Sequence, residues 1–319
     1  MYSGLIIGVL FGFLLQRGQF CFVSGFRTVY EQKNLHFLTA LCVAVSIQSL
    51  GLFALSETGV ISIPTSQLPL FATLMGGLLF GFGMVLANCC GSGAWFRAGE
   101  GALGSLIALV SFALTMASTQ TGSLKNFINT WLSNPLNIDN IHTTLGISPW
   151  ILTALLLLCS GVLLFYQRKQ TFSANAAFSP WLTGALIGLL GIAAWYFSAQ
   201  TGRNYGFGIA VPSANVVQYI VTGQQRYLNW GSLFVLGIIL GSFITAKISG
   251  DFNLRVPEPK DFLRRIIGGV IMGIGAALAG GCTVTNALVA TAYFSWQGWL
   301  ATIMIFIGAI IANKLTKRI

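Results

Sequence analysis

Long stretches without charge are the feature that most restricts what this chain can fold into. No Asp, Glu, Lys or Arg occurs in residues 34–56, 58–96, 101–124, 140–167, 170–202, 227–246 and 266–313. A helix that spans a bilayer needs about 20 predominantly apolar residues, so several stretches hold one span and the longest hold two. Only 8% of the 319 residues are charged, whereas a soluble domain has about a quarter. We therefore predict an all-α polytopic membrane protein with a single transmembrane domain over residues 1–319.

Nine spans are predicted, at residues 2–22, 37–55, 68–88, 101–118, 149–166, 181–199, 231–248, 264–282 and 296–312. The first carries no basic segment before it and no cleavage site after it, so we expect a span and not a signal peptide. An odd number of spans puts the two termini on opposite sides of the membrane. We read the polar residues 119–148 as an external loop and residues 249–263 as an internal one.

The basic residues lie in short loops and give the orientation. Loops on one side carry only Lys125, Arg203 and Arg226. Loops on the other side carry Arg27, Lys33, Arg97, Arg168, Lys169, Lys247, Arg255, Lys260, Arg264, Arg265, Lys314, Lys317 and Arg318. Cytoplasmic loops are enriched in Lys and Arg, so we predict a cytoplasmic C-terminus and an external N-terminus. The net charge of +10 therefore reflects orientation, and we expect no nucleic-acid partner.

A glycine pattern occurs twice along the chain. Gly76-Gly77-x3-Gly81-x-Gly83-x2-Leu86-Ala87-x2-Cys90 recurs as Gly268-Gly269-x3-Gly273-x-Gly275-x2-Leu278-Ala279-x2-Cys282, at an offset of 192 residues. Gly4 and Gly8 are echoed more weakly by Gly184 and Gly188. Glycines four apart also serve close helix packing, which does not explain the shared Leu-Ala-x-x-Cys ending. We predict repeat halves at residues 1–118 and 181–319, joined by a loop and span at 119–180, with the second half inverted.

Three cysteines lie at glycine-containing polar breaks in the apolar stretches: Cys21, Cys90 and Cys282. We expect a helix to end at each break and a short, non-crossing helix to follow. Irregular backbone at membrane depth needs protein or a water-lined cavity around it, and the free N–H groups of a helix start suit an anion. A neutral thiol is a weak hydrogen-bond donor that suits a soft anion which must also be released. Cys42 and Cys159 lie in mid-span and are predicted to be small hydrophobes.

Supporting roles are predicted for residues next to these breaks: Cys89, Ser92, Arg97, Glu100, Thr283 and Asn286. Arg97 and Glu100 either belong to the site or form an ion pair within one short helix. Two other classes of function remain open. A soft-metal carrier would need converging thiolates, and a thiol–disulfide enzyme would need a reactive cysteine pair. We predict no metal site and no cofactor.

The residues of these breaks occur in three motifs. They are Gln16-Arg17-Gly18-Gln19-Phe20-Cys21; Leu86-Ala87-Asn88-Cys89-Cys90 with Arg97-Ala98-Gly99-Glu100-Gly101; and Gly280-Gly281-Cys282 with Asn286 and Trp296-Gln297-Gly298-Trp299. Over nearly the whole chain they closely resemble the YeeE/YedE family. Where that family often has Gly-Gly-Cys, this chain has Asn88-Cys89-Cys90.

The resemblance implies a function and a path. It implies an inverted-repeat fold of nine spans with short non-crossing helices, in the bacterial inner membrane. It implies uptake of thiosulfate, without enzymatic change, between three thiols that fall on Cys21, Cys90 and Cys282. A selenium or other sulfur oxyanion is the alternative substrate, since the YedE branch is linked to selenium compounds. A cytoplasmic sulfur-carrier protein of the TusA type is the implied partner.

Overall fold

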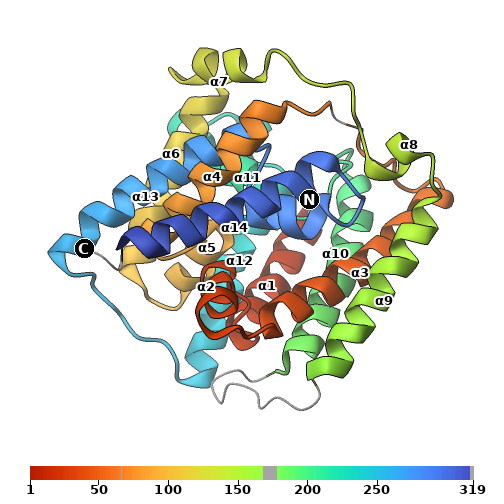
Figure 1. Cartoon of the computed structure of the whole chain (residues 1–319). Coiled ribbons are helices and arrows are strands. Elements are labelled where there is room, and N and C mark those ends of the chain that lie inside the picture. Colours follow the sequence, from red (N-terminus) through yellow and green to blue (C-terminus); the bar gives the residue numbers. More distant parts are fainter. Residues whose placement is uncertain (66, 168–177, 317–319) are drawn as a thin grey trace.

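The computed structural model describes residues 1–65, 67–167 and 178–316, and its regular elements are helices (Figure 1). The first part of the chain forms α1 (Tyr2–Arg17), α2 (Phe22–Gln32), α3 (His36–Glu57), α4 (Leu70–Leu86), α5 (Gly91–Gly99) and α6 (Leu103–Gln120). The middle part forms α7 (Lys125–Leu132), α8 (Ile141–Leu145) and α9 (Pro149–Gln167). The last part forms α10 (Pro180–Ala199), α11 (Ala210–Thr222), the 3₁₀ turn η1 (Gln225–Tyr227), α12 (Trp230–Ser249), α13 (Pro259–Leu278), the π-helical segment η2 (Val284–Ala290) and α14 (Trp296–Thr316).

The polytopic all-α fold is confirmed. Within the described ranges, eight helical segments are long and apolar enough to cross a membrane, and they coincide with eight of the nine predicted spans. The ninth, 264–282, corresponds to α13, a 20-residue helix. The charged side chains of its first turns (Lys260, Asp261, Arg264 and Arg265) make α13 more polar than the other long helices. Of the basic residues used for orientation, Arg168, Lys169, Lys317 and Arg318 lie outside the described residues.

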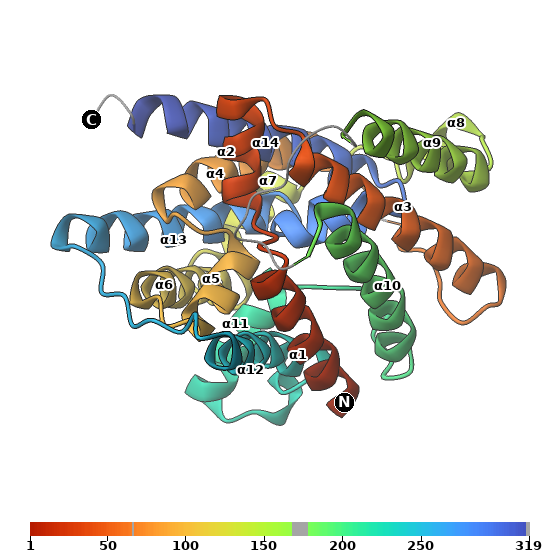
Figure 2. The same ribbon diagram turned by 90° about the horizontal axis from the view of Figure 1, so that it is seen from below.

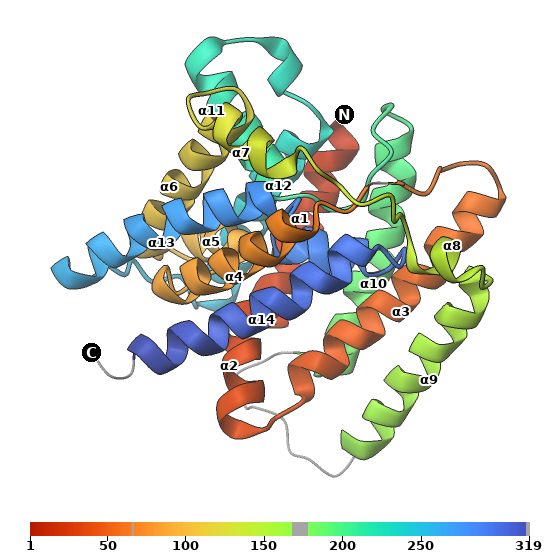
Figure 3. The ribbon, with the colours of Figure 1, turned by 45° about the horizontal axis from the view of Figure 1, so that its top comes forward.

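Short helices follow breaks in the apolar segments, as expected. α2 follows α1 after four residues, α5 follows α4, and η2 follows α13. The N-terminus lies at the same end of the molecule as α7 and α11, and α2 lies at the opposite end (Figure 3). The residues of α5 and η2 are mostly buried, whereas those of α2 are buried only in its first half.

Two long helix pairs cross with almost no space between their backbones. α1 packs on α12, where a Cβ added to Gly4 would collide with the carbonyl oxygen of Trp230. α10 packs on α3, where a Cβ added to Gly184 would collide with the carbonyl oxygen of Ala40. Small residues allow membrane helices to approach this closely and gain dispersion energy. α1 and α12 lie side by side in Figure 2.

The helices that carry the glycine repeat, α4 and α13, pack directly on each other. A Cβ on Gly76 would collide with the backbone nitrogen of Ala279, and a Cβ on Gly268 would collide with the backbone nitrogen of Ala87. Each contact is therefore the counterpart of the other in the repeat. Residues at matching positions of the pattern face each other across this helix pair, as in an interface built on a twofold axis.

Candidate functional site

Cys21, Cys90 and Cys282 have the same local backbone geometry. Each is the residue directly before a short helix, and its carbonyl oxygen accepts the first helical hydrogen bond, from the N–H groups of Gly25, Ala94 and Asn286 respectively, at 2.8 to 2.9 Å. The long helix before each cysteine ends in a left-handed residue two positions earlier: Gln19 (φ 48°), Asn88 (φ 52°) and Gly280 (φ 74°). A left-handed residue is a common way to end a helix. The three breaks therefore direct a thiol and a helix start into the protein interior.

A fourth helix start, that of α11, carries no thiol, and the residue before it has a helical backbone conformation, whereas Cys21 and Cys90 are extended. Ile209 precedes α11, and its carbonyl oxygen accepts from the N–H of Ser213 at 2.8 Å. Ile209 and Cys282 lie close together, because a Cβ added to Gly91 would be 3.4 Å from the Cγ2 atom of Ile209 and 3.4 Å from the Cβ of Cys282. The start of α5 therefore lies against both residues.

Cys90 occupies the middle position among the three thiols. The backbone N–H of Gly93 donates to its sulfur at 3.3 Å, and the hydroxyl of Ser92 lies 3.5 Å from the sulfur. A Cβ added to Gly93 would be 3.3 Å from the Cys90 sulfur and 3.9 Å from the Cys21 sulfur. The missing side chain at position 93 therefore leaves the space between these two thiols open.

Cys282 lies on the opposite side of the α5 start. A Cβ added to Gly91 would be 3.7 Å from its sulfur, and the Thr285 hydroxyl lies 3.6 Å from that sulfur. Backbone N–H groups from two helix starts lie near the same sulfur, those of Val284 and Thr285 and that of Ala210. All three thiol-bearing side chains are at most 2% exposed. The order of the thiols through the protein is therefore Cys282, Cys90, Cys21.

Arg97, on α5, brings a positive charge next to the Cys21 thiol. Its guanidinium donates to the Cys21 sulfur at 3.5 Å and to the carbonyl oxygen of Asn88 at 3.0 Å. These bonds hold the guanidinium between α1 and the end of α4. Of the two roles left open for Arg97, this geometry favours a role beside the thiols.

Two cavities reach this end of the path. One of about 620 Å³ is lined by Arg97, Glu100 and Ser105 together with residues of the α12–α13 connection. Another, of about 330 Å³, is lined by Cys21 itself, and Gln19 borders both cavities. Cys21 and Arg97 can therefore be approached by small polar species from the side of α2 and the α12–α13 connection.

The other predicted supporting residues occupy different environments. The Asn286 amide donates to the carbonyl oxygens of Gly281 at 2.9 Å and Ala279 at 3.3 Å, so it fixes the break at Cys282. The Thr283 hydroxyl is buried and has no hydrogen-bond partner among the residues that the structure describes. Cys89 is fully buried beside Cys90, with its Cβ 3.6 Å from a Cβ placed on Gly93.

The remaining cysteines do not join this cluster. Cys42 is half-buried on α3 and Cys159 is exposed on α9. α9 lies at the edge of the bundle, where it packs mainly on α3 (Figure 1). The two thiols thus differ in burial from Cys21, Cys90 and Cys282, which are all buried.

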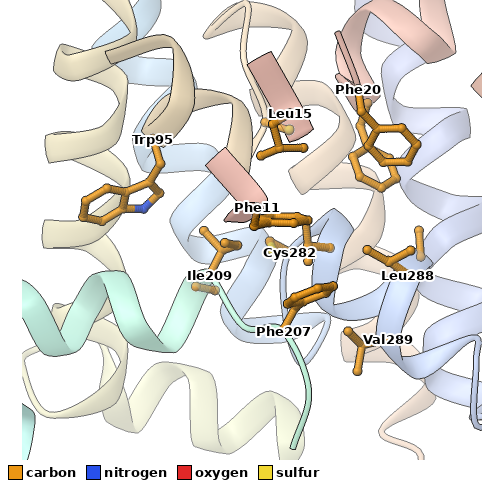
Figure 4. Close-up of a cluster of buried hydrophobic side chains, with 14 of the residues drawn as sticks. Phe11, Leu15, Phe20, Trp95, Phe207, Ile209, Cys282, Leu288 and Val289 are labelled. Atoms are coloured by element: carbon orange, nitrogen blue, oxygen red, sulfur yellow. The ribbon is translucent and has the colours of Figure 1, made fainter. Parts of the chain in front are cut away.

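Sequence reasoning missed four residues that shape the site. Gly91 and Gly93 keep the space around the thiols open, and Phe207 and Ile209 pack beside Cys282 (Figure 4). Alternate glycines in Gly206-Phe207-Gly208-Ile209 were the available signal. This signal was weak, because the segment lies in a connection that has no cysteine.

Comparisons with known proteins agree with the resemblance to the YeeE/YedE family. The sequence model described as "Sulphur transport" matches residues 17–311. The thiosulfate transporter TsuA of Escherichia coli (strain K12) is 40% identical, over 98% of this chain and 94% of the relative. The TsuA protein of Spirochaeta thermophila is 32% identical over 97% of this chain and 96% of the relative, and the probable transporter YedE of Salmonella typhimurium is 29% identical over 55% of this chain and 43% of the relative. This chain belongs to the Sulphur transport family.

Proposed function

We propose that this protein takes up thiosulfate across the bacterial inner membrane by passing the anion from Cys282 to Cys90 and then to Cys21. The observation that carries the proposal is the arrangement of these three buried thiols around the first turn of α5. Two relatives that bear the name thiosulfate transporter match almost the whole chain. The anion leaves the path unchanged, so the protein acts as a transporter and not as an enzyme.

Neutral thiols suit this substrate chemically. A thiol donates a weak hydrogen bond, and the terminal sulfur of thiosulfate is a soft, polarisable acceptor. Helix starts add backbone N–H groups and the positive end of a helix dipole, which favour an anion. The N–H of Gly93 near Cys90 and those of Thr285 and Ala210 near Cys282 support this role. The buried Thr283 hydroxyl adds an unused hydrogen-bonding group beside Cys282.

Arg97 marks the inner end of the proposed path. Its guanidinium attracts the anion from Cys90 toward Cys21, and the cavity of about 620 Å³ then receives it. Glu100 and Asp251 line the same cavity. Carboxylates there limit how long a divalent anion stays, because like charges repel at short range. Release toward the cytoplasm follows from this mixed lining.

The two halves of the chain, 1–118 and 181–319, form an inverted repeat in this proposal. Support comes from the reciprocal contacts between α4 and α13, and from the pairing of α1 with α12 and of α10 with α3. The second half then supplies Cys282 and Ile209 where the first supplies Cys90 and Cys21. Inverted repeats of this kind place substrate sites at the interface of the halves.

The orientation puts the N-terminus in the periplasm and the C-terminus in the cytoplasm. Arg27, Arg264 and Arg265 line a further cavity of about 290 Å³ on the side assigned to the cytoplasm. This basic inner face is where a sulfur-carrier protein of the TusA type would dock. An excess of basic residues in cytoplasmic loops supports the same orientation.

Growth on thiosulfate tests the proposal. The chain is expressed in bacteria that lack other thiosulfate importers, with thiosulfate as the sole sulfur source. Wild type and the control Cys159→Ala are expected to grow, whereas Cys21→Ala, Cys90→Ala and Cys282→Ala are expected to fail at matched expression. Growth of all three variants at the wild-type rate would refute the passage between thiols.

Substrate competition separates the alternatives. Uptake of radiolabelled thiosulfate is measured in the presence of unlabelled thiosulfate, of selenite or of a different sulfur oxyanion. A competitor that suppresses uptake at a lower concentration than unlabelled thiosulfate does would be favoured as the substrate. Copper(I) or zinc transport by wild type but not by Cys90→Ala would favour a soft-metal carrier. Loss of uptake after strict reduction would indicate a thiol–disulfide enzyme.

A further inference from the structure

The outer thiol of the proposed path, Cys282, is covered by side chains, whereas a cavity reaches the inner thiol, Cys21. Cavities reach Cys21 and Arg97, but Cys282 is fully buried beneath aliphatic and aromatic side chains. Figure 4 shows Phe11, Ile209 and Phe207 gathered around Cys282, with Phe207 on the side away from Phe20. An anion from the N-terminal end of the molecule therefore cannot reach Cys282 unless these side chains move.

The cover is an aromatic stack that joins three elements. Phe207 stacks on Phe11 of α1 with ring centroids 4.6 Å apart, and on Phe234 of α12 at 5.5 Å. Phe234 in turn stacks on Trp230 at 5.6 Å. Phe11, Phe207 and Phe234 have no exposed surface. Only Phe207 comes from a connection, so it can leave the stack without moving a long helix.

Two glycines, Gly206 and Gly208, flank Phe207 in the connection between α10 and α11. Glycines on both sides of Phe207 leave its backbone without neighbouring side chains. A Cβ on Gly206 would come 2.5 Å from the indole nitrogen of Trp195, and a Cβ on Gly208 would come 2.9 Å from the Arg203 guanidinium. The extended course of this connection between α10 and α11 is visible in Figure 2.

Arg203 anchors the start of the connection. Its guanidinium donates to the carbonyl oxygens of Tyr205 at 2.9 Å and Gly206 at 2.8 Å, and to the Ser198 hydroxyl at 2.9 Å. It also lies over the Trp230 ring, 5.2 Å from the centroid, which adds a cation–π attraction. Burial lowers the pKa of Arg203 to about 10, so the side chain stays charged at neutral pH.

We propose that residues 203–209 form the outer gate of the path, in which Phe207 and Ile209 close the approach to Cys282 and Arg203 holds the segment in place. The role of this gate in uptake rests on the proposed transport function, whereas its closure over Cys282 does not. Displacement of Phe207 from the stack opens the approach, and the charge of Arg203 in the same connection favours an incoming anion. The fourth helix start, at Ile209, thus carries an apolar side chain that closes the path instead of a thiol.

Thiol labelling tests the gate independently of the substrate. Spheroplasts that express the full chain are treated from outside with sulfonatoethyl methanethiosulfonate, an anionic reagent that does not cross membranes. Modification of the Cys282 peptide is followed by mass spectrometry in wild type, Phe207→Ala and Phe207→Leu. The matched control is Phe112→Ala, which removes an equally buried ring that packs on Phe80, away from the gate.

Phe207→Ala is expected to speed modification of Cys282 about tenfold, because it removes two aromatic pairs and a factor of ten corresponds to about 1.4 kcal/mol. The rate of Cys282 modification in Phe207→Leu is expected to lie between those of wild type and Phe207→Ala. If the alanine variant does not fold, the leucine variant alone tests the gate. Phe112→Ala is expected to match wild type. Inside-out vesicles should show equal labelling of Cys21 in every variant.

Two results would overturn the gate. One is an unchanged rate at Cys282 in folded Phe207 variants. The other is an equal acceleration in Phe112→Ala, which would mean that any loss of core packing exposes the thiol. If the wild-type protein does not support growth on thiosulfate but the Phe207 variants still speed the labelling of Cys282, the result would count against the proposed function and not against the gate.

Discussion

Arg97 donates a hydrogen bond to the sulfur of Cys21 at 3.5 Å while it also binds the carbonyl oxygen of Asn88 at 3.0 Å. One guanidinium therefore ties the inner thiol to the end of α4, the helix that leads to Cys90. This contact links α1, α4 and α5 at one point. Substitution of Arg97 therefore tests the inner part of the site directly.

Replacement of Arg97 is expected to reduce uptake. Arg97→Ala removes both hydrogen bonds, and Arg97→Lys cannot form them together because an ammonium group lacks the fork of a guanidinium. Hydrogen bonds to charged groups contribute about 1.5–3 kcal/mol, so initial uptake of radiolabelled thiosulfate should fall by about tenfold to a hundredfold. Arg226→Ala, in an exposed cation–π pair with Tyr227, is the control. Wild-type uptake by Arg97→Lys would show that charge alone is sufficient.

The space at Gly93 is expected to be needed for transport. Gly93→Val places methyl groups between the sulfurs of Cys21 and Cys90, which lie 3.9 and 3.3 Å from a Cβ at this position. Uptake should fall roughly tenfold or more, since each ~1.4 kcal/mol of added barrier is a factor of ten. Gly161→Val on α9, where nothing lies within 4 Å, should leave uptake unchanged. Normal uptake by a folded Gly93→Val protein would argue that the anion does not pass between these thiols.

The adjacent cysteines are expected to differ in importance. Only the sulfur of Cys90 accepts the N–H of Gly93 at the start of α5, so Cys90→Ala should abolish growth on thiosulfate. Cys89→Ala should keep uptake within about threefold of wild type, because it removes one buried sulfur and leaves the helix start intact. The reverse ranking of the two variants in a matched uptake assay would assign the path to Cys89.

The glycine repeat is expected to contribute equally to stability from both halves. Gly76→Ala and Gly268→Ala each force a methyl group onto the backbone of the facing helix. Overpacking of this kind costs about 1–3 kcal/mol, so both variants should lower the thermal unfolding temperature of the detergent-solubilised protein by similar amounts. Gly161→Ala serves as the control. A large effect at one glycine alone would argue against reciprocal packing of α4 and α13.

The sequence by itself determined the class of fold and the positions of the breaks. Uncharged stretches of sufficient length leave the backbone no alternative to helices in a bilayer. The breaks at Cys21, Cys90 and Cys282 were also visible, because glycine and polar residues interrupt the apolar pattern at each of them. The span predicted at residues 264–282 also corresponds to a long helix, α13, although its first turns are charged.

Only the tertiary structure decided which residues meet. Arg97 and Cys21 are 76 positions apart, and Gly91 and Cys282 come from different halves of the chain, so no local pattern predicts their contacts. Phe207 and Ile209 lack a chemical signal of their own and gain their place from packing against Phe11 and Cys282. Local sequence determines where a helix ends, whereas the close approach of glycine-lined helices determines which ends face one another.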